Sequence, residues 1–473
     1  MPFGYKVRGE EHIATTSEGI NRKFFIKYIV PYYYYLAVNQ KFRTMKRINQ
    51  LLIFIFVFLF CSCSEVGDRG QKQSTVDDFS VLTKGLTRSQ NEVGNSLLGF
   101  SIDCFKEVAS DAIDNCLVSP YSIATDLSML SMGASEGTYD ELTGVLGFKD
   151  FSYRQLGDYY SLISEKIFSS ESILSVSNAV WLDNTVVESV KPEFKDDASN
   201  YFKSEINALD FNSEKSAETI NDWVKVKTDG KIDRIISYDD IKKNNDIAVL
   251  TNAVSFNGKW ADQGYSTEEM PFKSLSGNTA NKVYFKGCGR SIREYNVSGK
   301  EKNEPSVVEL GIDDNYSISF ILPPAKQNLI KFVNSIDSKK WIRWMSSLTP
   351  GETASTIVVF KIPCFRSDAE YQCVKYLKNL GIKSLFEVEN CDLSRMINIP
   401  VSVRTIKQKS AIDVNSKGSS ASSATAIDIS PYTGVQSYGN TIKEYQFIAD
   451  RPFVYAIVEN TTQTILFLGT VTE

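Results

Sequence analysis

From Asn95 to Glu473 the sequence runs without a low-complexity linker or an internal repeat. Apolar residues first recur at helical spacing, as in Leu98, Ile102 and Phe105, and a second helical stretch spans 214–232. Short β-rich segments dominate the rest and lie at 173–182, 248–256, 317–322, 356–362, 453–458 and 464–471. Helices that precede strands in this way predict one large α+β domain with mixed antiparallel β-sheets.

Charge and histidine content exclude several classes of function. The chain of 473 residues has 52 Lys and Arg against 57 Asp and Glu, so we expect no nucleic-acid partner. Its single histidine, His12, precedes the export signal described below. A mature chain without histidine cannot run a Ser-His-Asp or Cys-His mechanism, and it lacks the commonest metal-binding imidazole. We therefore expect no enzyme, no catalytic residue, no metal and no other cofactor.

The eight cysteines do not form a metal site by their spacing. Cys61 and Cys63 end a hydrophobic leader. The other six are far apart in the sequence and are Cys104, Cys116, Cys288, Cys364, Cys373 and Cys391. None of them forms the close pairs of a zinc cluster. We interpret them as buried thiols, with one or two disulfides as the alternative, and the sequence does not pair them.

A short export signal begins at Met45. Lys46 and Arg47 precede an apolar run at 51–60, which is too short to cross a bilayer because that takes about 20 apolar residues. The end of the run resembles a bacterial lipoprotein signal with Cys63 as the lipidated residue, so residues 45–62 are predicted to be the signal peptide. A membrane-spanning anchor is the alternative, because Cys61 makes the match imperfect.

The segments on either side of this signal have different expected fates. Residues 1–44 would hinder export, so we expect translation to begin at Met45 and this upstream extension to be absent from the protein. Residues 63–94 are rich in Ser, Asp, Gly, Lys and Gln and are predicted to be a flexible tether. The globular domain is predicted to span 95–473. We expect an exported protein, lipid-anchored to the bacterial outer membrane or cell surface, or secreted.

Several motifs occur in a fixed order along the domain. They are Asn115-Cys116-Leu117-Val118-Ser119-Pro120-Tyr121-Ser122-Ile123, Asn178-Ala179-Val180-Trp181, Ile220-Asn221-Asp222-Trp223-Val224, Leu250-Thr251-Asn252-Ala253, Phe256-Asn257-Gly258-Lys259-Trp260 and Phe447-Ile448-Ala449-Asp450-Arg451-Pro452-Phe453. Their content and order resemble those of the serpins, a family of serine protease inhibitors. The resemblance covers nearly the whole domain and implies the serpin fold, with an exposed reactive-centre loop near the C-terminus.

The serpin resemblance implies roles for a group of buried residues. Ser119, Ser122 and Asn252 match positions under the central sheet, where its strands part. Gln408 stands where the family often has histidine, and Trp260 is assigned to the same sheet-opening region. A simple helix cap is the alternative role of Ser119, since a proline follows it.

A polar segment rich in small residues lies between Val414 and Phe447 and is longer than an ordinary loop. In its first half, alternate residues form two sets. The set that can be buried is Ser419, Ala421, Ser423, Thr425, Ile427 and Ile429, and the interleaved set is Ser420, Ser422, Ala424, Ala426, Asp428 and Ser430. This spacing predicts an exposed segment that can become a strand with one buried face.

By the serpin resemblance this segment is the reactive-centre loop, the bait that a protease cleaves. Its hinge is expected at Ser416, Gly418, Ser419, Ala421 and Ser423, although the family usually has Glu where Ser416 stands. After cleavage a serpin inserts the freed strand into its central sheet and traps the protease as an acyl-enzyme. We therefore expect a suicide-substrate inhibitor that is a monomer.

The bond that is cleaved can be counted from either end of the loop. The hinge count gives Tyr432-Thr433, whereas counting back from the C-terminal motif gives a bond near Asn440-Thr441. We prefer the hinge count, because the hinge fixes how much strand can insert. The expected partner is a chymotrypsin-like or elastase-like serine protease, or a papain-like cysteine protease. A non-inhibitory serpin-fold binding protein on the cell envelope is the alternative.

Overall fold

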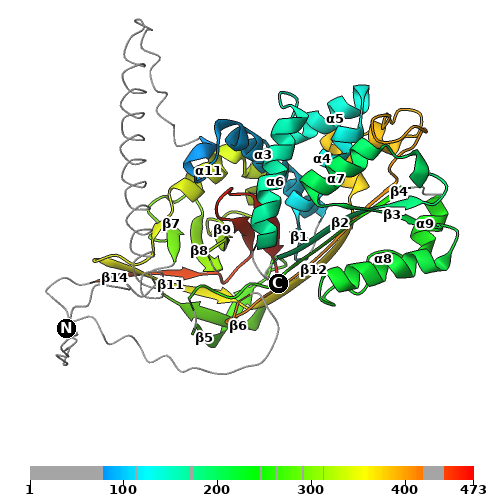
Figure 1. Cartoon of the computed structure of the whole chain (residues 1–473). Helices are drawn as coiled ribbons and strands as arrows, with labels where there is room; N and C mark the ends of the chain where they lie inside the picture. Colours follow the sequence, from blue (N-terminus) through cyan, green and yellow to red (C-terminus); the bar gives the residue numbers. More distant parts are fainter. Residues whose placement is uncertain are drawn as a thin grey trace, which may run out of the picture. The chain divides into compact units, whose positions relative to one another are not determined.

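The computed structural model describes residues 78–111, 114–169, 174–244, 248–262, 264–289, 292–312, 314–418 and 442–473. It contains helices and three β-sheets (Figure 1). The helices are η2 (Phe79–Val81), α3 (Arg88–Asp111), α4 (Pro120–Gly133), α5 (Glu136–Leu146), α6 (Tyr153–Ser169), η3 (Val187–Ser189), α7 (Pro192–Phe202), α8 (Glu214–Lys227), α9 (Tyr238–Asn244), α10 (Leu329–Ser335), α11 (Ser338–Ser346), α12 (Val374–Leu380) and η4 (Ser384–Phe386).

A five-stranded sheet has the strand order β12-β13-β4-β2-β3. Its strands are β2 (Leu174–Asp183), β3 (Glu205–Leu209), β4 (Ala248–Phe256), β12 (Phe365–Gln372) and β13 (Thr405–Val414). The pairs β12·β13 and β4·β2 are antiparallel, whereas β13·β4 and β2·β3 are parallel. We call the parallel boundary between β13 and β4 the seam. Gln408 lies opposite Asn252 in its register.

Both faces of this sheet are buried around β4, in which every residue is buried. Leu250 and Val254 belong to the main core, whereas Val249 and Ala253 belong to a second apolar cluster built with α8. In Figure 1 the sheet lies between α8 on one side and α4, α5 and α7 on the other. A strand that is buried on both faces needs apolar residues along nearly its whole length, as in β4.

The other two sheets complete the main core. A seven-stranded sheet has the order β1-β16-β15-β9-β8-β7-β10, and a four-stranded sheet has the order β14-β11-β6-β5. Their strands are β1 (Leu117–Val118), β5 (Ser266–Lys273), β6 (Thr279–Gly287), β7 (Arg293–Tyr295), β8 (Ser306–Ile312), β9 (Tyr316–Leu322), β10 (Thr349–Pro350), β11 (Thr356–Pro363), β14 (Lys443–Ile448), β15 (Phe453–Glu459) and β16 (Ile465–Val471). The C-terminal hairpin β15·β16 is buried along its whole length.

The predicted α+β class is confirmed, and each predicted strand segment coincides with a strand to within one or two residues. The predicted boundary of the tether at residue 94 is wrong, because α3 begins at Arg88 and Val93 is fully buried. Thr87 and Gln90 form a reciprocal capping box: the Thr87 N–H donates to Gln90 Oε1 over 2.9 Å, and the Gln90 N–H donates to Thr87 Oγ1 over 3.3 Å. The spacing of Thr87 and Gln90 marks the start of α3, which the composition of residues 63–94 did not reveal.

The six cysteines of the domain are free thiols, so the interpretation as thiols holds and the alternative of disulfides is wrong for them. Cys104, Cys116 and Cys373 are buried, whereas Cys288 is exposed. Within the described ranges no group of His, Cys, Asp and Glu could hold a metal ion. The same ranges contain no helix long and apolar enough to span a bilayer.

Candidate functional site

Helix α4 lies under the five-stranded sheet and carries two of the predicted site residues at its start. Ser119 is its N-cap, with Oγ accepting from the Ser122 N–H over 3.4 Å, and Pro120 occupies the first turn. The predicted cap is therefore confirmed. All residues of α4 are buried, including polar ones such as Ser122, whose Oγ has no hydrogen-bond partner.

A buried polar bridge crosses the seam on the α4 side. The Gln408 side chain accepts from the Ser119 N–H and donates to the Ser119 carbonyl, both over 2.9 Å. Its Nε2 also donates to Asn252 Oδ1 over 3.4 Å. Gln408 belongs to β13 and Asn252 to β4, so the two seam strands are joined to each other and to α4 by amide groups. The structure thus brings Ser119, Ser122, Asn252 and Gln408 together. Trp260, which was assigned to the same region, does not belong to this cluster, because it contacts Asn415 and Phe285 instead.

The same cluster contains two residues that we did not predict, Asp126 and Asn178. Asn252 Nδ2 donates to Asn178 Oδ1 over 2.9 Å and to Asp126 Oδ2 over 3.5 Å. Burial raises the pKa of the Asp126 carboxyl well above its usual range, and the Asn252 contact offsets this only in part. The signal in the sequence was an acidic residue inside the apolar run of α4, one helical turn after Ser122.

Ser416 and Gly418, the residues of the expected hinge that the structure describes, lie at the far end of the seam, apart from this cluster. Trp260 Nε1 donates to the Asn415 carbonyl over 2.8 Å, and the Trp260 ring stacks on Phe285. Gly418 forms antiparallel bridges both to Asn415, directly after β13, and to Lys259, just beyond β4. Gly418 therefore sits between the extensions of the two seam strands.

Only glycine fits this position. Gly418 has φ of 129°, which L side chains rarely adopt. An added Cβ would lie 2.3 Å from the Gly258 carbonyl oxygen.

Ser416 lies in the turn before Gly418, beside the half-buried thiol of Cys364. Burial raises the pKa of Cys364 to about 11, and a hydrogen bond from the Ser416 backbone opposes this rise. Ser416 is uncharged, so this chain has a neutral contact at the position where serpins usually have an acidic side chain. Ser419, Ala421, Ser423, Tyr432, Thr433 and Cys63 lie outside the described residues.

Residues 95–473 match the family model described as "Serpin (serine protease inhibitor)". The chain belongs to the serpin family. This serpin is 28% identical to Serpin I2 of Homo sapiens over 383 residues, covering 79% of the chain and 90% of the relative. An uncharacterised serpin-like protein of Methanosarcina mazei is 25% identical over 410 residues, covering 85% of the chain and 90% of the relative.

Solved structures agree on the fold of this serpin. The thermophilic serpin tengpin in its native state gives a TM-score of 0.71 at 25% identity, with 83% of this chain and 96% of that one covered. Thyroxine-binding globulin in complex with thyroxine gives a TM-score of 0.68 at 22% identity, with 80% and 98% covered. The predicted serpin fold is confirmed. The same fold thus also belongs to a protein named for binding a hormone.

Proposed function

We propose that this serpin inhibits a serine or cysteine protease as a suicide substrate. The observation that carries the proposal is the position of Gly418, which is bridged to Asn415 and Lys259, just beyond the ends of the two seam strands. Because β13 and β4 run parallel, a strand continuing from Gly418 between them would be antiparallel to both. The alternation in 419–430 supplies a strand with one face that can be buried.

The chemistry belongs to the protease, and the serpin supplies the bait and the trap. The protease's serine oxygen or cysteine sulfur bonds to the carbonyl carbon of Tyr432, and the bond to Thr433 breaks with release of its amino group. Insertion of the freed strand then pulls the acyl-enzyme against the serpin. Distortion of the protease's oxyanion hole stalls hydrolysis, because deacylation depends on close placement of its groups.

A non-inhibitory binding protein is the second candidate function. The observation that favours it is the neutral hinge: Ser416 replaces the family's usual Glu, and Ser422 and Ser423 replace usual alanines. The positions expected to insert are nevertheless small and lack proline before Pro431. This favours inhibition.

The experiment that tests the proposal mixes the purified protein with chymotrypsin, and separately with elastase, trypsin and papain. Trapping gives a band that survives boiling in detergent and releases a peptide that begins at Thr433. Ser419→Arg should be cleaved without forming this band, because a long charged side chain cannot enter the sheet. Tyr432→Arg should move trapping from chymotrypsin to trypsin. Clean cleavage of the wild-type chain by every protease would replace inhibition with the binding function.

We further propose that the serpin acts at the cell envelope, held there by a lipid on Cys63. The apolar run ending at Phe60 and the cysteine that follows support this placement. Labelled palmitate should enter the wild-type chain expressed in a bacterium with a lipoprotein pathway, and Cys63→Ala should abolish the labelling. Equal labelling of the variant would place the lipid on a residue other than Cys63. No labelling of either protein would point to the spanning anchor or to secretion.

A further inference from the structure

Residues 228–244, which we call the strap, connect α8 to β4 over the face of the five-stranded sheet opposite α4. The Asn221 side chain of α8 fastens the strap, accepting from the N–H groups of Ile235 and Ile236 over 2.8 and 3.1 Å and donating to the Ile236 carbonyl over 2.8 Å. Helix α8 and the strap therefore form one unit. When β13 separates from β4, this unit must stay with only one of the two strands.

Apolar packing assigns the strap to the β4 side. The second apolar cluster consists of Ala179, Trp181, Phe211, Ala217, Ile220, Val224, Ile232, Ile235, Ile236, Ile241, Val249 and Ala253. These residues come from β2, β4, α8, the strap and the turn before α8. Neither β12 nor β13, both fully described, contributes to the cluster. Moving β12 and β13 away from β4 would leave this core intact.

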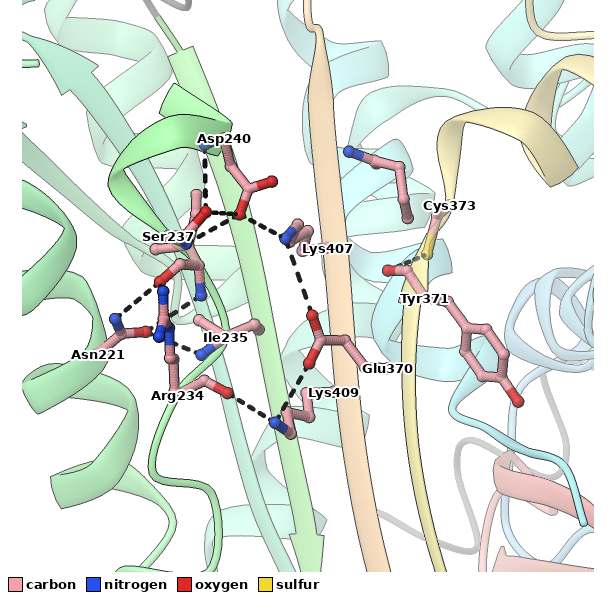
Figure 2. Close-up of polar contacts among 12 residues, drawn as sticks. Asn221, Arg234, Ile235, Ser237, Asp240, Glu370, Tyr371, Cys373, Lys407 and Lys409 are labelled. Atoms are coloured by element: carbon pink, nitrogen blue, oxygen red, sulfur yellow. Dashed lines mark hydrogen bonds and ion pairs between the residues drawn. The ribbon is translucent and has the colours of Figure 1, made fainter. Parts of the chain in front are cut away.

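Two lysines of β13 make the polar contacts that do cross the seam on this face (Figure 2). Lys407 Nζ donates to Asp240 Oδ2 over 2.9 Å, and Lys409 Nζ donates to the Arg234 carbonyl over 2.8 Å. Asp240 is itself oriented by Ser237, whose N–H and Oγ donate to Oδ2 over 2.8 and 2.6 Å. The Lys407 side chain is only 12% exposed, so its ion pair is screened less than a surface pair.

Glu370 of β12 offers the lysines a second partner on their own side of the seam. Its Oε1 lies 3.8 Å from Lys407 Nζ, and its Oε2 lies 3.2 Å from Lys409 Nζ. Glu370 is directly opposite Lys409 in the β12·β13 ladder, so it would move together with the lysines. Figure 2 shows Glu370 between the two lysines, facing the strap.

We propose that Lys407 is a latch that sets the rate at which the seam opens, exchanging Asp240 of the strap for Glu370 of β12. The proposal rests on the proposed function, because strand insertion is the event that requires opening. A strand occupies about 4.8 Å of sheet width, so β13 must move by about that distance from β4 and the strap. The Lys407–Asp240 contact then breaks, whereas the contact with Glu370 remains available.

The test measures how fast a synthetic peptide with the sequence of residues 419–431 anneals into the intact, full-length protein, followed by native gel shift and tryptophan fluorescence. Lys407→Gln should accelerate annealing about three- to fivefold, the effect of losing an ion pair of modest strength. Glu370→Gln should slow annealing, because the opening lysines lose their second partner. Added salt should accelerate annealing of the wild type and have little effect on Lys407→Gln.

A matched control separates the latch from general destabilisation. Lys227 of α8 pairs with Glu205 of β3 over 2.6 Å, and both residues lie on the strap side of the seam. Lys227→Gln should therefore leave the annealing rate unchanged. Acceleration by this control equal to that of Lys407→Gln, or a Lys407→Gln rate equal to wild type, would overturn the latch.

The latch and the inhibitory function fail in different ways. A wild-type chain that anneals the peptide but forms no detergent-stable complex removes the inhibitory function, and the opposite effects of Lys407→Gln and Glu370→Gln still decide the latch. A chain that traps protease but shows no such difference removes the latch alone. A wild-type chain that takes up no peptide has no opening seam, and this result overturns the latch as well.

Discussion

At the scale of single residues, the buried surroundings of Asp126 disfavour the ionised form of its carboxyl group. Asp126 is 2% exposed and makes no ion pair within the described part of the chain. The titratable groups near it, Cys373 and Tyr160, are buried and carry no positive charge. The native state therefore holds a proton that the unfolded chain releases, and stability should fall as the pH rises from the ordinary carboxyl pKa toward the raised one.

Asp126→Asn removes this titration while keeping the shape of the side chain. The variant should be more stable than wild type at about pH 8, by about 1.4 kcal/mol for each unit by which burial raises the native pKa, and the difference should shrink toward about pH 4. Urea unfolding across this range measures it. A stability difference that stays constant with pH would show that Asp126 is ionised in the native state.

At the scale of elements, the apolar strand β4 was predictable from the sequence, whereas the polar strand β13 was not. Apolar β4 was found with its observed bounds, Ala248–Phe256. β13 was missed, because it places Lys407 and Lys409 on one face and Gln408 and Ser410 on the other, which conceals its period of two. β13 provides the amide contact and the lysine contacts across the seam. The same polar residues prevented its prediction from hydrophobic periodicity.

The polar cluster could be predicted only where the serpin resemblance supplied positions. Ser119, Ser122, Asn252 and Gln408 were named from matched motifs, and they do lie together. Lys407 and Asp240 are 167 residues apart, and no local pattern links them. Their pairing exists because the strap crosses the sheet, and that crossing is a consequence of tertiary packing.

At the scale of the whole molecule, the proposed function requires the uncleaved form to have the less stable of two possible sheets. A strand inserted between β13 and β4 would replace one parallel ladder with two antiparallel ladders, which are slightly more stable per residue. Each added hydrogen bond contributes about 0.5–1.5 kcal/mol net. The cost of opening includes the amide bridge between Gln408 and Asn252 and the Lys407–Asp240 pair.

Cleavage of the loop should therefore raise the thermal unfolding midpoint of this serpin, by roughly 10 °C or more. Calorimetry of the intact and cleaved proteins measures the change. Cleaved Ser419→Arg should unfold near the midpoint of its intact form, because its strand stays outside the sheet. A cleaved wild-type chain that unfolds no later than the intact one would mean that the sheet gains no strand. Gly418 would then be only a tight turn at the end of the seam.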